Sequence, residues 1–367
     1  MGAAGPRLRQ GRRRRHQEHG EQLGVRRHPV AWGIGGVAAV VFAVVLGLVI
    51  GPANIDAGGA VLSVVDHIPG VHVNSGLTHQ QAVIIWELRL PRVVLGLFVG
   101  AMLAMAGASY QGVFRNPLAD PYLLGVAAGA GLGATVAFVS GLSADSAFSA
   151  VPLAAFVGAL GAVLLTYTVG ATGDRSRSTA SLILAGVAVA SLLTALQTFV
   201  QQRDTKVISQ VYTWLLGRLT VTGWSQVALV LPYAVVTGAV LLAHRRLLDV
   251  LSVGDHEATT LGVPVDRTRL VVVVAASFAT AAAVAVSGLI AFVGIIVPHT
   301  IRLLGGTSYR VILPLSILFG GAFLVLADIV AREAMAPAEL PIGVVTAFFG
   351  APFFVMLLRR RRGVPAT

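Results

Sequence analysis

The chain has 367 residues, of which 56% are hydrophobic and only 12% are charged. Soluble domains usually carry about 25% charged residues, so this composition excludes an ordinary soluble protein and indicates a membrane protein. Because the chain has no cysteine, disulfide bonds and thiolate metal sites are excluded as well.

Long uncharged stretches take up most of the chain. A bilayer core of about 30 Å needs roughly 20 apolar residues of helix to cross it, and nine stretches of about 17 to 32 residues contain no Asp, Glu, Lys or Arg. We therefore expect an all-α polytopic membrane protein. In chain order the stretches are Val30–Asn54, Val93–Phe114, Pro121–Ala144, Ser146–Gly173, Ser178–Gln202, Leu219–His244, Leu270–Ile301, Val311–Ala327 and Leu340–Leu358.

The net charge of +11 is concentrated at the two arginine-rich ends, which favours a topological cause over nucleic-acid binding. The positive-inside rule places both ends in the cytoplasm and requires an even number of spans. The stretch Leu270–Ile301 would be about 48 Å of helix, enough for two spans. A turn near Ser287-Gly288 would divide it, which gives about ten transmembrane helices.

These helices would form one transmembrane domain over residues 30–358. A basic cytoplasmic tail at 1–29, expected to be disordered, would precede it, and a second basic tail at 359–367 would follow. A cleaved signal peptide is disfavoured because the apolar run from Val30 is too long and no small-x-small cleavage site follows it. The cluster Arg12–Arg15 is either a contact for anionic lipid headgroups or simply a signal that fixes topology.

Several catalytic chemistries are excluded by missing residues. A Walker A loop needs Gly-Lys-Ser/Thr, and the chain's only lysine, Lys206, lies in Asp-Thr-Lys-Val. His256-Glu257 begins like a zinc-protease helix, but Thr260 stands where the second histidine should be. We therefore expect no catalytic residue, no metal site and no intramembrane chemistry.

The spans are also nearly bare of ionisable residues, unlike those of most ion-coupled transporters. Asp328 is the main exception, and Arg332 lies four residues later, where an ion pair within one helix would form. The absence of a proton relay favours a driving force supplied by a partner ATPase.

A series of long motifs carries a family resemblance. In order, they are Glu87–Arg92, Gln111–Gly125, Leu251–Val263, Gly288–His299, Ala327–Arg332 and Glu339–Phe354. The series resembles the FecCD-type permeases, the permease family of ABC importers for ferric siderophores, haem and cobalamin. The match runs from about Glu87 to Leu358.

The resemblance implies a type II ABC importer permease fold that dimerises with a second copy or a sister permease. Two copies of a cytoplasmic ABC ATPase would bind ATP and magnesium, so that this chain is not an enzyme and binds no cofactor. An extracytoplasmic substrate-binding protein would deliver the cargo. Ferric siderophore is the favoured cargo, with cobalamin or haem as alternatives.

Localisation follows from composition and charge. The preference for Arg over Lys and the Ala/Gly/Val bias suggest a GC-rich bacterium, whose plasma membrane would hold the chain with both termini in the cytoplasm. An ion-coupled secondary transporter and a non-transporting membrane scaffold remain alternatives of a different class.

Three arginines break the charge asymmetry on the predicted external face: Arg89, Arg92 and Arg332. The resemblance implies that they receive carboxylates of the binding protein, because Arg–carboxylate contacts are directional and can be bidentate. The alternative is structural pairing, Arg89 with Glu87 or Arg332 with Asp328.

The loop at about 248–268 is the longest predicted cytoplasmic loop. Gly254 would break the chain, Asp255 could cap, and Glu257–Leu261 would form a short helix that ends at Gly262. The resemblance implies that this segment couples to the ATPase; an ordinary surface helix is the alternative. The predicted coupling residues are Gly254, Asp255, His256, Glu257, Ala258, Leu261 and Gly262.

Two further segments receive roles. The residues Asn116, Pro117, Asp120 and Pro121 predict a rigid cytoplasmic turn, because proline fixes φ and restricts the residue before it. The fifth span, Ser181–Val200, and its flanking loop Gly170–Ser178 resemble a pathway wall and inner gate. Its polar side chains would line the pathway or bond to the i−4 carbonyl. They are Ser191, Thr194, Gln197 and Thr198.

Overall fold

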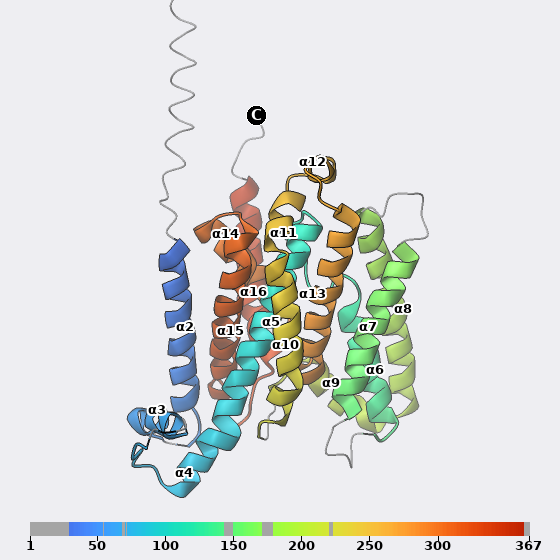
Figure 1. Ribbon diagram of the computed structural model, residues 1–367. Coiled ribbons are helices and arrows are strands. Elements are labelled where there is room, and N and C mark those ends of the chain that lie inside the picture. Colours follow the sequence, from blue (N-terminus) through green and yellow to red (C-terminus); the bar gives the residue numbers. More distant parts are fainter. Residues whose placement is uncertain are drawn as a thin grey trace, which may run out of the picture.

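The computed structural model describes residues 29–53, 55–67, 70, 72–142, 150–170, 179–219 and 223–362. Within these ranges every regular element is a helix (Figure 1). The predicted tails lie outside the described residues, apart from Pro29 and residues 359–362, which belong to helices. The helices are α2 (Pro29–Val49), α3 (Ala57–Asp66), α4 (His79–Val83), η1 (Ile84–Arg89), α5 (Leu90–Val113), α6 (Val126–Val139), α7 (Ala150–Gly170), α8 (Thr179–Arg203), η2 (Thr205–Val207), α9 (Ile208–Leu215), α10 (Ser225–Ala243), α11 (Arg245–Leu251), α12 (Asp255–Thr260), α13 (Val265–Ser287), α14 (Val293–Gly305), α15 (Tyr309–Glu333) and α16 (Ile342–Arg362).

The predicted spans all coincide with helices. Among the described residues, seven helices are long and apolar enough to cross a membrane: α2, the continuous helix His79–Val113, α7, α8, α10, α13 and α15. The other three predicted spans fall on α6, α14 and α16, whose apolar parts are shorter. The all-helical, polytopic fold class predicted from the sequence is confirmed.

The long stretch at 270–301 contains two helices, as predicted. Helix α13 ends at Ser287, and Gly288 follows with φ of +67°, in the left-handed region that favours glycine. A Cβ atom on Gly288 would also collide with the carbonyl oxygen of Trp214. The second helix, α14, has only 13 residues, so the two helices differ in length.

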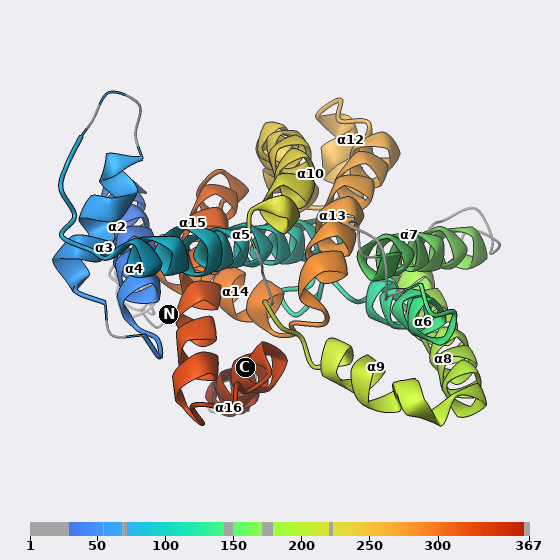
Figure 2. The ribbon, with the colours of Figure 1, turned by 90° about the horizontal axis from the view of Figure 1, so that it is seen from below.

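Helix α5 runs through the centre of the bundle (Figure 2) and packs against α10, α13, α14 and α15. Glycines permit its closest contacts. A Cβ atom on Gly107 would overlap the carbonyl oxygen of Gly294 on α14, and one on Gly100 would overlap that of Gly320 on α15. Small residues at such contacts let helices associate where lipid supplies no hydrophobic driving force.

The connection between α5 and α6 differs from the prediction. The sequence predicts a cytoplasmic turn followed by a span from Pro121, whereas α6 begins only at Val126. The intervening segment folds back against the α13–α14 connection. The Tyr122 hydroxyl donates to the Ile290 carbonyl at 2.9 Å and accepts from the Ile290 N–H at 3.0 Å. The segment therefore forms part of the packed core.

Local hydrogen bonds explain why this segment is not helical. The Asn116 side chain accepts a bond from the Leu118 N–H at 3.0 Å, and Asp120 accepts one from the Tyr122 N–H at 2.7 Å. Asn and Asp favour such turns because the side chain replaces a backbone acceptor. A rigid turn at Asn116 and Asp120 is thus present, but its continuation lies inside the bundle.

The two ends of the bundle carry different elements (Figure 1). Helix α2 begins and α16 ends at the end that carries α11 and α12, which we call the α12 end. The opposite end carries α3, α4 and α9, and we call it the α4 end. A shared end for α2 and α16 agrees with an even number of crossings.

Candidate docking and coupling sites

Two acidic side chains share the guanidinium of Arg92 at the α4 end. Its Nε and Nη2 donate to Asp328 on α15 at 3.1 and 2.9 Å, and its Nη1 and Nη2 donate to Glu339 before α16 at 2.9 and 3.0 Å. Both contacts are bidentate, which fixes the plane of the guanidinium. Arg92 therefore joins the first turn of α5 to α15 and to the α15–α16 connection.

Arg332 completes the same cluster one turn further along α15. Its Nε lies 3.2 Å from Asp328 Oδ2, and its Nη atoms donate to the carbonyls of Ile50 and Gly47, each at 3.4 Å. The last carbonyls of a helix have no partner within the helix, so this guanidinium satisfies the end of α2. The pair of Arg332 with Asp328 that the sequence offers as an alternative role is present.

Arg89 has the same function from the other side of α2. Its Nη1 donates to the carbonyls of Leu48 and Val49 at 2.6 and 2.9 Å, and its Nη2 donates to that of Ala53 at 2.5 Å. Among the described residues, no ion pair joins Arg89 to Glu87, so the alternative pairing proposed from the sequence is wrong. Local spacing suggested it, whereas the guanidinium reaches α2 instead.

Burial separates the three predicted docking arginines. Arg89 is 5% exposed and Arg332 is 7% exposed, while Arg92 is half-buried. Glu339, which sequence reasoning did not single out, is the outermost member, with 41% of its side chain exposed. The hydrogen bonds from Arg92 lower the pKa of Glu339 below its ordinary value, so the carboxylate stays charged. Docking of a partner here stays a prediction.

The predicted coupling segment forms a short helix at the α12 end. Helix α12 begins at Asp255, two residues earlier than predicted, and Gly262 follows it with φ of +79°. Gly254, not Asp255, is the N-cap residue. The Asp255 carboxylate instead binds Arg269 on α13 at 3.0 Å and Arg115 at 3.5 Å, which corrects its predicted capping role.

The two faces of α12 differ in exposure. Ala258 is fully buried against the bundle, whereas Leu261 is 71% exposed and Val253, just before the helix, is 68% exposed. His256 and Glu257 are also exposed. The ion pairs of Asp255 connect this helix to Arg269 on α13 and to Arg115, which follows α5.

A polar cavity of about 460 Å³, lined by residues of α5, α11, α14 and α15, was not predicted. Arg302 on α14 donates to Gln111 Oε1 at 2.9 Å within it. Asp249 on α11 accepts hydrogen bonds from the Ser308 hydroxyl at 2.8 Å and from the Tyr309 N–H at 2.5 Å. These partners are 59 to 191 residues apart in sequence, so no local pattern could have revealed them.

The predicted pathway residues all lie on α8. Ser191, Thr194 and Thr198 are exposed on its surface, while Gln197 is buried. The hydroxyls of Ser191 and Thr198 donate to i−4 carbonyls at 2.9 and 3.0 Å, as the alternative interpretation predicts. The predicted gate loop, Gly170–Ser178, lies outside the described residues except for Gly170, the last residue of α7.

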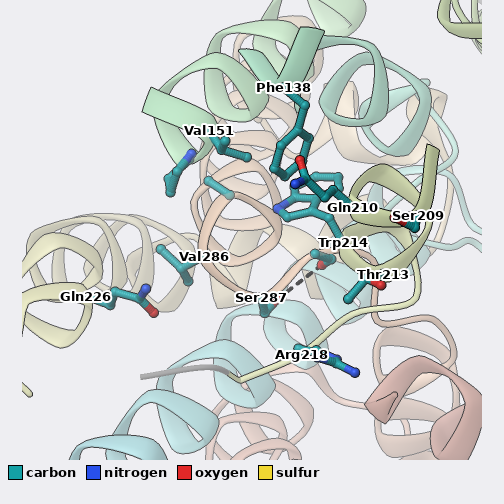
Figure 3. A pocket seen from close by; sticks show the side chains of 13 residues that line it. Phe138, Val151, Ser209, Gln210, Thr213, Trp214, Arg218, Gln226, Val286 and Ser287 are labelled. Carbon is teal, nitrogen blue, oxygen red and sulfur yellow. Dashed lines mark hydrogen bonds between the residues drawn. The ribbon is translucent and has the colours of Figure 1, made fainter. Parts of the chain in front are cut away.

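A second cavity, of about 470 Å³, opens near the α4 end between α6, α7, α9, α10 and α13 (Figure 3). Polar side chains line it, among them Gln210 and Thr213 on α9, Arg218 and Gln226. Figure 3 shows Phe138 on α6 and Trp214 on α9 among the side chains that line it. Among the described residues, no group of three His, Asp or Glu side chains is placed to hold a metal ion there or elsewhere.

A comparison with known protein families identifies the family of this chain. The model of the FecCD transport family matches residues 39–360. The chain belongs to the FecCD transport family. Its members are permeases of ABC importers, which work with a separate ATPase and a substrate-binding protein, so this FecCD permease is the multi-pass membrane subunit of such an importer.

Related proteins are similar in sequence to this permease over most of its length. It is 48% identical to the cobalamin import system permease protein BtuC of Halobacterium salinarum over 78% of this chain and 76% of that one. It is 39% identical to the Fe(3+) dicitrate transport system permease protein FecD of Escherichia coli over 77% and 87%. A solved ABC transporter of the metal-chelate type in an inward-facing conformation matches with a TM-score of 0.77 and 30% identity, covering 89% and 98% of the two chains.

Proposed function

We propose that this FecCD permease imports a metal chelate across a plasma membrane, with the α12 end in the cytoplasm. The observation that carries the proposal is the difference between the two ends of the bundle. An arginine–carboxylate cluster lies at the α4 end, and a short exposed helix, held by ion pairs to α13 and α5, lies at the α12 end. The first suits a binding protein and the second suits an ATPase.

At the α4 end we propose that Arg92 receives the binding protein. It is the least buried of the three arginines, and its Glu339 partner is held at an exposed site where water screens the pair. A carboxylate on the binding protein would replace Glu339 without uncovering Asp328. Arg89 and Arg332 support this site by fixing the end of α2, and the displacement of α2 would expose them.

At the α12 end we propose that two ATPase copies each bind one α12 of a permease dimer, whose second subunit is another copy or a sister permease. Leu261 and Val253 offer apolar contacts, and the buried Ala258 seats the helix. ATP and magnesium would be bound by the ATPase, and this chain would bind no cofactor. Alternating access at the dimer interface would then move the cargo, with the polar face of α8 along its route.

The cargo has three candidates: ferric siderophore, cobalamin and haem. Ferric siderophore is our first candidate, supported by the ferric dicitrate relative and by the metal-chelate transporter of similar fold. Cobalamin is the second, favoured by the relative that is 48% identical. All three are metal chelates that a permease of one architecture could pass, because a separate binding protein selects them.

ATP-driven uptake into proteoliposomes tests the proposal. The permease would be co-purified with its ATPase and binding protein, and uptake of radiolabelled ferric siderophore and radiolabelled cobalamin would be compared. We expect ATP-dependent uptake of one of them and none with an ionophore-sensitive ion gradient alone. Uptake driven by the gradient without ATP would contradict the proposal and support a secondary transporter.

Two exposed leucines provide a matched test of coupling. Leu261→Asp places a charge on the proposed ATPase contact, and Leu142→Asp places the same charge just after α6, where the side chain is 57% exposed. We expect Leu261→Asp to lower co-purification of the ATPase at least tenfold and Leu142→Asp to leave it unchanged. Equal effects of the two substitutions would exclude α12 as the contact.

A further inference from the structure

Helices α10 and α13 lie side by side (Figure 2). An apolar groove runs between them on the outside of the bundle. Its volume is about 730 Å³. Val236 and Val240 on α10, and Val271, Val274 and Phe278 on α13, are among the side chains that line it. Val236 is 61% exposed and Val274 is 43% exposed, so the groove opens outward rather than into the bundle.

An aromatic cluster closes the groove near the middle of the bundle. The ring of Phe156 on α7 lies 5.2 Å from that of Tyr233 and 6.0 Å from that of Phe278. From Arg267, at the start of α13, to Phe278 the helix rises by about 16 Å. That length is about half of a 30 Å hydrocarbon core, so the groove spans a single leaflet.

Two arginines lie at the α12 ends of the two helices that form the groove. Arg267 precedes Leu270, Val271 and Val274 on the same face of α13, because residues three, four and seven apart share a helix face. Side chains on a helix lean toward its N-terminus, so Arg267 leans toward the α12 end, where a lipid headgroup would lie. Arg246 stands where α10 gives way to α11. Both are exposed.

These two arginines are unpaired within the part of the chain that the structure describes. Neither takes part in an ion pair or a side-chain hydrogen bond there, whereas Arg269, only two residues from Arg267, binds Asp255 at 3.0 Å. Two unpaired cations beside an apolar groove of one leaflet's length match a ligand with an anionic head and an acyl chain. A neutral detergent-like molecule would use the groove but not the cations.

We propose that the α10–α13 groove binds one acyl chain of an anionic phospholipid, with Arg267 and Arg246 holding its phosphate. The site also adjoins α12. Arg269, which anchors Asp255 and thereby α12, lies in the same first turns of α13 as Arg267. Bound lipid would therefore restrict the part of α13 against which α12 is held. The inference needs only that the chain spans a membrane and does not rest on the cargo or the partners.

Native mass spectrometry of the purified full-length chain tests the site. The chain in mild detergent would be titrated with phosphatidylglycerol and, separately, with phosphatidylcholine of the same acyl chains. We expect one tightly retained phosphatidylglycerol. Arg267→Gln should lower the preference for it about fivefold, since a cation near the headgroup contributes about 1 kcal/mol. Arg310→Gln, an exposed arginine at the same end with a 60% exposed side chain, should leave the preference unchanged.

Adjacent valines on α10 supply the control for the acyl chain. Val236 lines the groove and Val235 does not, yet their exposures are 61% and 59%. Val236→Trp should abolish the retained lipid, whereas Val235→Trp should retain it. Equal retention of the two lipids by the unaltered chain, or equal behaviour of the two tryptophan variants, would overturn the proposal. Size-exclusion profiles would confirm that each variant is folded.

Discussion

Asp328 carries the largest expected effect on stability in the arginine cluster at the α4 end. Its carboxylate is 3% exposed, accepts hydrogen bonds from Arg92, the shortest at 2.9 Å, and forms an ion pair with Arg332 at 3.2 Å. Asp328→Ala would leave Arg332 buried without its anion, since only two carbonyls at 3.4 Å would remain. Breaking a buried pair in this way costs about 3–5 kcal/mol, because one charge stays desolvated and uncompensated.

Glu339→Ala provides the contrast within the same cluster. Its carboxylate also bonds to Arg92, but 41% of its side chain is exposed, so solvent screens the pair. Exposed pairs contribute about 0–1 kcal/mol. Asp328→Ala and Glu339→Ala each remove a carboxylate from Arg92, yet their free energies of unfolding should differ by about 3 kcal/mol.

Unfolding by sodium dodecyl sulfate, followed by tryptophan fluorescence, measures this difference. Trp86 and Trp224 lie 5.3 Å apart at the same end of the bundle, so they report on the relevant packing. Arg332→Met added to Asp328→Ala should recover part of the loss, because it removes the unpaired charge. Similar stability for Asp328→Ala and Glu339→Ala, or no recovery in the double variant, would refute the reasoning.

Three more substitutions test helix packing, the integrity of α12 and the pH dependence of stability. Gly107→Leu should prevent folding, because even a Cβ atom would overlap the Gly294 carbonyl of α14. Size-exclusion chromatography in detergent should then show aggregated protein, and a normal elution profile would contradict the prediction. Ala258→Pro should abolish ATP-driven transport, because proline lacks the N–H that donates to the Gly254 carbonyl at 2.9 Å. Proline within a helix costs about 3 kcal/mol. Glu257→Pro should be tolerated, because residue 257 lies in the first turn of α12. Burial raises the pKa of Asp120 to about 6. The protonated carboxyl stabilises the folded protein, and this contribution is complete below about pH 4 and lost as the pH rises through 6. The free energy of unfolding should therefore fall between about pH 4 and 7, and Asp120→Asn should remove that fall. An unchanged pH profile would contradict the last prediction.

Sequence reasoning predicted the helices well because hydrophobicity and helix breakers act locally. The division of 270–301 at Ser287-Gly288 needed only the length of an apolar run and a glycine, and the helix of the 248–268 loop needed only glycines and polar residues in order. Its starting residue was misplaced by two, since the Asp255 carboxylate was expected to cap and instead binds Arg269.

The site depended on contacts that no local pattern records. Whether Arg89 would meet Glu87 or a helix end was decided by the position of α2, which lies about 40 residues earlier in the chain.

By itself the sequence determined that this protein is a polytopic helical permease, because apolar length, charge asymmetry and long motifs are properties of the chain alone. Only the tertiary structure decided that Arg92 meets Asp328 and Glu339, respectively 236 and 247 residues away, that Tyr122 closes onto Ile290, and that α10 and α13 leave a groove between them. The physical reason is that charge pairing and close packing depend on distance in space, and helices distant in sequence set that distance.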